Sequence, residues 1–268
     1  MRKPVYSDNW PESWKVSHIY DLQEVFGAPL NLGYAYAYEN RWQACLRLAR
    51  KYFPVGGRIL DIAAAQGNAS LRLAEAGFDV TWNDLREELI GYVRLKHEHG
   101  RIEYLPGNVF ALSFPKSFDG ILVTEIIEHV AHPDQFLSQV KTLIRPGGHI
   151  VLTTPNGAYF RSHMPRFSEC TDFSLLEARQ FGPNSDGHIF HLWKDEMEAM
   201  SRQAGLEVVS IQFVSNPLTN GHIKLETLLH LLPKRWVFLL ERLSRRLPES
   251  ARALVMNHLV VCLKKPGP

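Results

Sequence analysis

Two glutamates and a histidine lie close together in the segment Glu125-Ile-Ile-Glu128-His129. Two carboxylates and an imidazole can bind a divalent cation, so we predict a metal site made of Glu125, Glu128, His129 and a later histidine, His188 or its neighbour His191. Imidazole titrates near neutral pH. The same residues are therefore candidates for proton transfer, with His129 as the general base and Glu128 and His188 beside it. The competing interpretation is that they only cap a helix or pack in a loop.

The position of this segment depends on the strands that come before it. The apolar run Arg58–Ala63 predicts a buried strand, a sharp turn follows at 63–67, and apolar spacing predicts a helix at Asn68–Ala76 that stops at a glycine. A second apolar strand at Phe78–Trp82 is followed by an acid, Asp84. In an α/β unit of this kind the ligand lies over the carboxyl ends of the strands, and the acid after the second strand holds the ribose hydroxyls.

The turn after the first strand indicates which nucleotide is bound. A dinucleotide site favours G-x-G-x-x-G, because bare backbone must approach a pyrophosphate. Here only Gly67 is a glycine, and Ala63 and Ala65 precede it. The turn therefore favours a ligand with an adenosine and no phosphate, and S-adenosylmethionine fits that description. An ordinary βαβ unit that binds nothing and a nicotinamide domain are the alternatives.

An ordered series of motifs resembles the class I S-adenosylmethionine-dependent methyltransferases, including methyltransferase types 11 and 23. Their first motif, D-x-G-x-G-x-G, matches at Asp61 and Gly67, with alanine at the two earlier glycine positions. Asp84 matches their ribose-binding acid. In the segment that matches the third motif, Tyr104–Val109, Asn108 replaces the acid near the adenine amino group, and its amide oxygen can still accept a hydrogen bond.

Later segments continue the resemblance. Residues 118–124 match the fourth strand and residues 143–156 match the fifth strand with its P-G-G turn. The resemblance runs from about Tyr38 to Val214 and resumes at the last strand. It implies that the following residues bind the cofactor: Asp61, Ala63, Ala65, Gly67, Asp84, Leu85, Asn108, Val109 and Thr124.

The Glu-x-x-Glu-His segment resembles two groups within this family. These are the ubiquinone-type catechol O-methyltransferases and the RNA 3′-terminal 2′-O-methyltransferases, in which such a cluster holds a magnesium ion. A cation lowers the pKa of a coordinated hydroxyl. We therefore expect O-methylation of a small molecule or of a sugar in a glycan or lipid-linked intermediate. An RNA 2′-O-methyltransferase and a non-catalytic scaffold domain are the alternatives; a net charge of +2 makes nucleic acid a poor partner.

The expected fold is α/β, a Rossmann-like doubly wound sheet of seven strands, mostly parallel with an antiparallel last strand. One domain is expected over 1–268: an N-terminal cap and helix (1–53), a cofactor-binding core (54–215), a helical insertion (216–255), and the last strand and tail (256–268). Within the cap, residues 1–37 are expected to be irregular, with a helix only at Tyr38–Phe53. Residues 158–187 are polar and aperiodic, which predicts a lid or acceptor loop.

The insertion is predicted to be a very apolar helical pair with a basic edge. Such helices usually bury themselves on a sheet. The alternatives for 222–247 are a homodimer surface, a lid over an apolar acceptor, and a face that lies on a membrane. Three widely spaced cysteines show no disulfide framework, and neither a signal peptide nor a spanning helix is visible. We therefore expect a cytoplasmic protein, with a peripheral membrane location as the alternative.

Overall fold

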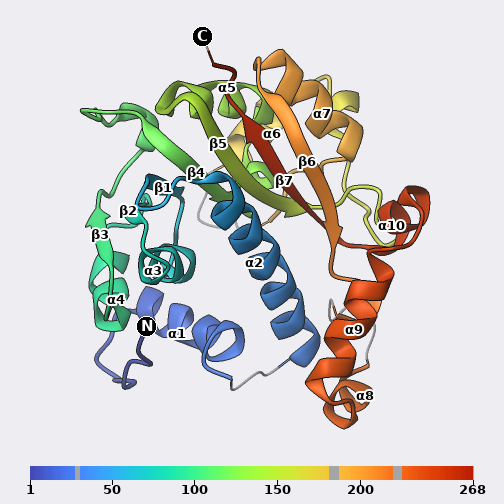
Figure 1. The fold of residues 1–268 in the computed structure, drawn as a ribbon, viewed down its shortest axis with the longest axis horizontal. Coiled ribbons are helices and arrows are strands. Elements are labelled where there is room, and N and C mark those ends of the chain that lie inside the picture. Colours follow the sequence, from blue (N-terminus) through green and yellow to red (C-terminus); the bar gives the residue numbers. More distant parts are fainter. Residues whose placement is uncertain (28–30, 181–186, 220–224, 268) are drawn as a thin grey trace.

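One mixed sheet forms the centre of the molecule (Figure 1). The computed structural model describes residues 1–27, 31–180, 187–219 and 225–267, and within them the strand order is β3-β2-β1-β4-β5-β7-β6. The strands are β1 Arg58–Ile62, β2 Asp79–Asn83, β3 Arg101–Tyr104, β4 Phe118–Thr124, β5 Ile144–Pro155, β6 Glu207–Val214 and β7 His258–Lys264. Strands β1 to β5 pair in parallel, whereas β7 is antiparallel to both β5 and β6. This confirms the predicted fold class.

Helices cover both faces of the sheet. They are α1 Glu12–Glu24, α2 Leu32–Tyr52, α3 Asn68–Glu75, α4 Leu89–Lys96, α5 Pro133–Leu143, α6 Ser174–Arg179, α7 Lys194–Gln203, α8 Glu226–Leu231, α9 Lys234–Ser244 and α10 Glu249–Val255. Helices α2 and α3 pack on one face, and α5 and α7 pack on the other. Successive side chains of a strand point to opposite faces. In β4, Leu122 therefore joins the layer of α2, while Ile121 and Val123 join the layer of α5.

The N-terminal segment is more regular than the sequence predicts. Residues 12–24 form α1, and α2 begins at Leu32 rather than Tyr38, where the side chain of Asn31 accepts a hydrogen bond from the Tyr34 amide. The prediction of an irregular 1–37 was wrong because α1 has no apolar stripe. The residues that α1 buries include Ser17, His18 and Asp21, which are all polar.

Two other segments differ from the prediction. The expected aperiodic loop at 158–187 contains a 3-10 turn at Phe167–Glu169 and the short helix α6, and residues 181–186 lie outside the described part of the chain. The insertion before the last strand holds α8, α9 and α10 rather than a helical pair, and residues 220–224 are outside the described part. The expected division of the chain at 53, 215 and 255 stays a prediction. Within the described residues, no helix is both long enough and apolar enough to cross a bilayer.

A buried ion pair joins α1 to the cofactor-binding half of the sheet. The Lys96 ammonium donates to the Asp21 carboxylate and to the side-chain oxygen of Asn68, each at 2.7 Å. The Tyr92 hydroxyl also donates to Asp21 at 2.7 Å. Both side chains of the pair are fully buried. Removal of one partner would leave an uncompensated charge in the interior.

The substitution Lys96→Met tests the dependence of the fold on this pair. We expect it to lower the free energy of unfolding by about 3–5 kcal/mol, since the Asp21 carboxylate would lose its cation. Urea unfolding followed by circular dichroism measures the change. The matched control Arg94→Met lies on the exposed face of the same helix and should cost no more than about 1 kcal/mol. Equal losses in the two variants would contradict a special role for the pair.

Candidate active site

A cavity of about 430 Å³ lies at the carboxyl ends of β1, β2 and β4. Its polar lining includes Asp84 and Asn108. The apolar walls come from Ile62, Val109, Phe110, Ile126 and Phe136. A cavity of this kind, apolar with a few fixed polar groups, is typical of a small-molecule site. Its place at the carboxyl edge of a parallel sheet is where this class of fold binds ligands.

The turn after β1 keeps the backbone shape of a glycine motif although two of its three glycine positions are alanine. Ala63 and Ala65 have φ angles of 53° and 48°, and Gly67 has 74°. The left-handed region costs an ordinary residue roughly 1–2 kcal/mol. At Gly67 a side chain would also collide, because an added Cβ would lie 2.7 Å from Cγ1 of Val93. The turn that leads into α3 is therefore strained, but it keeps the backbone conformation of the glycine motif.

Asp84 fastens this turn to the end of β2. Its carboxylate is buried and accepts a hydrogen bond from the Ala65 amide at 2.8 Å. The Arg86 amide and Nε each donate to the other oxygen at 3.0 Å. The Arg86 side chain is about half exposed (54 %), so it covers the carboxylate from the solvent side.

Asp61 lies fully buried under the turn. One oxygen accepts a hydrogen bond from the Ser70 hydroxyl at 2.5 Å, and the other has no partner among the described residues. Burial and the charge of Asp84 raise the pKa of this carboxyl, the hydrogen bonds from Ser70 oppose the rise, and the net pKa is about 7. An acid held in this way is under-satisfied in the absence of a ligand.

The structure separates the predicted cofactor-binding residues into two sets. The cavity lining contains Ala63, Asp84, Leu85, Asn108 and Val109. Outside it lie Asp61, Ala65 and Gly67, which support the turn, and Thr124, at the end of β4. The Asn108 side-chain oxygen accepts a hydrogen bond from the Phe110 amide at 3.1 Å, which caps a 3-10 turn at Val109–Ala111 and leaves a second lone pair available.

A second cluster forms where the chain leaves β4. Ligand atoms of Glu128, His129 and His188 lie within 4.8 Å of one another. Two backbone amides, those of Ile189 and Phe190, donate to the Glu128 carbonyl at 2.8 and 3.2 Å, which brings His188 to the cluster. The 3-10 turn Ile127–His129 lies between Ile126 and Val130, both of which line the cavity, so the cluster adjoins the cavity rim.

The Glu128 carboxylate is unusual. It is fully buried, and neither of its oxygens makes a hydrogen bond of good geometry in the part of the chain that the structure describes, although the Thr154 hydroxyl lies near enough to lower its pKa in part. Burial and the nearby charge of Glu125 raise its pKa well above the usual range. The helix that follows, α5, has no side-chain hydrogen bond at its N-cap, His132. The environment suits either a protonated acid or a carboxylate paired with a cation.

Glu125 lies apart from this cluster and has different partners. Its φ is 54°, and its carboxylate accepts a hydrogen bond from the Thr153 hydroxyl at 2.7 Å and lies 3.1 Å from Nε2 of His258. Nε of Arg41 is 3.8 Å away. Burial alone would raise the pKa of Glu125, but Arg41 and His258 hold it far below its ordinary value. Arg41, Thr153 and His258 could not be recognised from the sequence, because no local motif connects them.

His188 and His191 were alternative candidates for the later histidine, and the structure places them in contact with each other. Nδ1 of His188 is 2.8 Å from Nε2 of His191, whose Nδ1 is 2.8 Å from the Ser162 hydroxyl. The rings of His129 and His188 meet edge to face at 4.9 Å. His191 therefore stands behind His188 and orients it, while His188 belongs to the cluster.

The fold, the cavity at the carboxyl ends of the strands and the motif turn define a class I S-adenosylmethionine-dependent methyltransferase. Residues 34–211 match the family model of a methyltransferase domain, which is more than half of the chain. The chain therefore belongs to that methyltransferase family. The scaffold alternative was based on Ala63 and Ala65, and both keep the glycine-like conformation.

Known proteins agree with this assignment. The ubiquinone biosynthesis O-methyltransferase of Aromatoleum aromaticum is 31% identical over 169 residues, which cover 61% of this chain and 70% of that protein. The protein of the same name from Pseudomonas aeruginosa is 32% identical over 180 residues, which cover 63% and 73%.

Two solved structures share the fold. The 4+2 cyclase SpnF has a TM-score of 0.56 at 17% identity and covers 96% of this chain and 97% of its own. The N-methyltransferase NodS from Bradyrhizobium japonicum, solved with S-adenosylhomocysteine, has a TM-score of 0.53 at 15% identity and covers 96% and 100%. Because the two differ in activity, this likeness supports the fold and not the reaction.

The pH dependence of stability tests the environment of Asp61. Its pKa is about 7 in the folded protein against an ordinary 3.8. Between these values the unfolded chain ionises the group while the folded protein keeps the proton, so folding stability falls as the pH rises, by up to about 4 kcal/mol in total. We expect Asp61→Asn to gain stability relative to the wild type from pH 4 to pH 8 in urea unfolding. Parallel stability curves for the two proteins would contradict this.

Proposed function

We propose that this methyltransferase methylates a hydroxyl group, on a small molecule or on a sugar of a glycan or lipid-linked intermediate. The observation that carries the proposal is the buried Glu128 carboxylate beside His129 and His188, next to the cofactor cavity. A hydroxyl acceptor needs a group that takes or weakens its proton, and this cluster can do either. The relatives named as O-methyltransferases support the same reaction.

Cofactor binding is assigned to the residues around the cavity. Asp84 would hold the ribose hydroxyls, Asn108 and Val109 the adenine, and the 63–67 turn the amino acid end. The sulfonium supplies an activated methyl group, so the protein must align the acceptor with it and exclude water. For the ribose to reach Asp84, the guanidinium of Arg86 must give up its hydrogen bonds to the carboxylate. Because the Arg86 side chain is about half exposed, its displacement costs little free energy.

Two mechanisms can activate the acceptor at the second cluster. In the first, His129 accepts the proton of the hydroxyl directly, and Glu128 and His188 orient its ring. In the second, Glu128, His129 and His188 would hold a divalent cation, which would lower the pKa of the hydroxyl. Two imidazoles with one carboxylate suit manganese, cobalt or zinc better than magnesium. Glu125 can join the set only by leaving Thr153 and His258.

An RNA 2′-hydroxyl is the second candidate acceptor, because the same glutamate–histidine cluster would serve it. The net charge of +2 provides little attraction to a phosphate backbone. We also infer a cytoplasmic location. Cys45, Cys170 and Cys262 are all free thiols, which is the usual state in a reducing compartment.

Cofactor affinity distinguishes the roles of the two neighbours Asp84 and Arg86. We expect Asp84→Ala to weaken S-adenosylmethionine binding about 10- to 150-fold, because two hydrogen bonds to a charged acceptor are lost. Arg86→Ala should bind the cofactor as well as the wild type or better, since it removes the competitor for the carboxylate. Titration calorimetry with the cofactor and with S-adenosylhomocysteine measures both. Equal losses in the two variants would contradict the ribose assignment.

Activity measurements separate the two mechanisms. We expect His129→Ala to lower methyl transfer to a catechol acceptor about 100- to 10,000-fold while cofactor affinity stays unchanged. If a cation acts, a chelator abolishes wild-type activity, added manganese restores it, and calorimetry shows that Glu128→Gln loses manganese binding. If His129 acts as a base, the chelator has no effect. Full activity of His129→Ala would overturn both mechanisms.

A further inference from the structure

Helix α9 is apolar on two opposite faces. Its inner face packs against α2 and α8, where Val237 is buried and the ring of Phe238 meets Tyr36 edge to face at 5.8 Å. The opposite side consists of Trp236, Leu239, Leu240 and Leu243, and Leu247 follows in the turn after the helix; all five are between 36% and 49% exposed, and we call them the outer apolar face. Leu239, Leu240 and Leu243 lie three, four and seven residues after Trp236, which places these four side chains on one side of the helix.

The surroundings of α9 make this face accessible. In Figure 1, α8 and α9 stand beside α2 and extend away from the sheet. Leu231, at the end of α8, is 77% exposed. Contiguous exposed apolar side chains usually mark a surface that meets a partner or a membrane. These helices also lie beyond the matched family region, 34–211, so the common methyltransferase core does not account for them.

A basic edge runs along the outer apolar face. Arg235 and Arg242 are exposed and lie seven residues apart, which places them on the same side of α9, and the exposed Arg246 follows in the turn after the helix. Within the described residues none of the three forms an ion pair; the arginine of this region that does is Arg245, with Glu241. Side chains of this kind beside an apolar face are typical of helices that lie at a membrane interface.

A cavity of about 380 Å³ opens between α2 and α9 beside this edge. Three of its lining residues are arginines, Arg47, Arg242 and Arg245, and we call it the arginine pocket. Arg47 and Arg245 line it together, and burial and the charge of Arg245 lower the pKa of Arg47. Guanidinium groups bind phosphate oxygens in pairs of hydrogen bonds. The pocket is therefore suited to a phosphate group.

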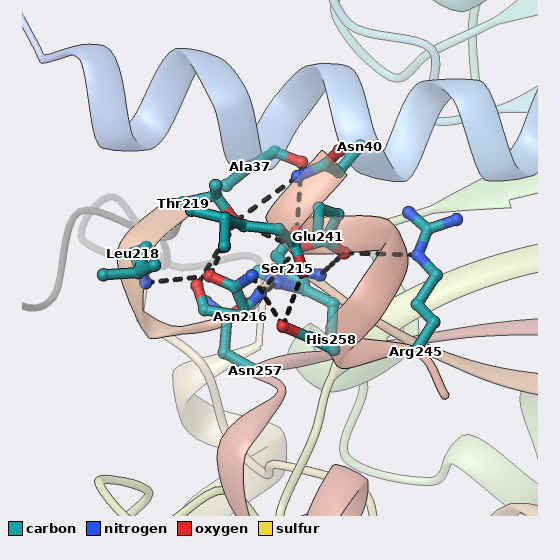
Figure 2. Close-up of polar contacts among 12 residues, drawn as sticks. Ala37, Asn40, Ser215, Asn216, Leu218, Thr219, Glu241, Arg245, Asn257 and His258 are labelled. Carbon is teal, nitrogen blue, oxygen red and sulfur yellow. Dashed lines mark hydrogen bonds and ion pairs between the residues drawn. The ribbon is translucent and has the colours of Figure 1, made fainter. Parts of the chain in front are cut away.

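The one acid of the pocket is already engaged. The Glu241 carboxylate accepts hydrogen bonds from the amides of Ser215 and Asn216 at 2.8 and 2.9 Å and from the Thr219 hydroxyl at 3.1 Å (Figure 2). Nε of Arg245 donates to it at 3.3 Å. One buried carboxylate thus faces three guanidinium groups, and the pocket keeps an excess of positive charge.

A second copy of this chain is a poor occupant of the same surface. Glu241 is the one acid of α9, and it is buried. Another outer apolar face would therefore offer no acid to the basic edge. In an antiparallel pair of α9 helices the two basic edges would also face each other, which is destabilising. A surface that is both apolar and anionic can bury the outer apolar face and also pair with the arginines of the basic edge.

We propose that the outer apolar face of α9 docks on an anionic lipid bilayer and that the arginine pocket receives a headgroup phosphate. The apolar side chains enter the boundary between headgroups and acyl chains, and the basic edge lies among the phosphates. This surface is independent of the cofactor cavity, so the proposal does not rest on the reaction assigned above. The proposed binding partner is a membrane surface and not a soluble phosphate compound.

Co-sedimentation of the full chain with vesicles tests the proposal. We expect binding to phosphatidylcholine mixed with phosphatidylglycerol, little binding to phosphatidylcholine alone, and weaker binding as salt is added. Leu239→Ser/Leu243→Ser and Arg47→Gln/Arg242→Gln should each lower the affinity for the mixed vesicles at least tenfold. The control Arg50→Gln/Lys51→Gln removes the same charge from the exposed end of α2 and should bind like the wild type.

Four results would overturn the proposal. The first is no binding of the wild type to mixed vesicles at low salt. The second is an equal loss in the Arg50/Lys51 control, which would show diffuse charge attraction. The third is saturable binding of inorganic phosphate, by calorimetry, without vesicle binding. The fourth is a dimer in sedimentation velocity that Leu239→Ser/Leu243→Ser dissociates. Methyl transfer to a soluble acceptor, measured in parallel, reports on the proposed function separately.

Discussion

The hydrogen bond from the Ala65 amide to the buried Asp84 carboxylate is the constraint on which the cofactor cavity depends. It fastens the turn after β1 to the end of β2 and holds an alanine in the left-handed region, at a cost of roughly 1–2 kcal/mol. Asp61, buried beneath the same turn with one oxygen unpartnered, destabilises the site further. Strain and unsatisfied polar groups collect where a ligand binds, because the remaining structure over-determines them.

The sheet could be predicted from the sequence because parallel strands buried on both faces are short apolar runs between turn residues. Helix α1 could not, because its buried positions are polar. Asp21 is paired with Lys96 of α4, and only the folded structure brings these two residues together. Hydrophobic periodicity therefore could not indicate α1. Any element that packs through a polar network rather than through an apolar stripe lacks this periodic signal in the same way.

The candidate site, too, could be predicted from the sequence only in part. Spacing along the chain placed Glu128 and His129 together, and the position after the second apolar strand identified Asp84. Spacing gave no information on direction, however: the positive φ of Glu125 turns its carboxylate toward Thr153 and His258 instead. His188 reaches the cluster through backbone hydrogen bonds from the residues that follow it, which depend on tertiary structure.

The orientation of α9 shows how a buried charge can select one packing. A helix with two apolar faces has two comparable ways to lie on its neighbours, and apolar contact alone would not distinguish them. Glu241 does, because its carboxylate reaches the amides of Ser215 and Asn216 in one rotation of the helix. In the other rotation, the carboxylate would leave these amides and their hydrogen bonds would be lost. The outward direction of the apolar face is therefore determined by the fold itself.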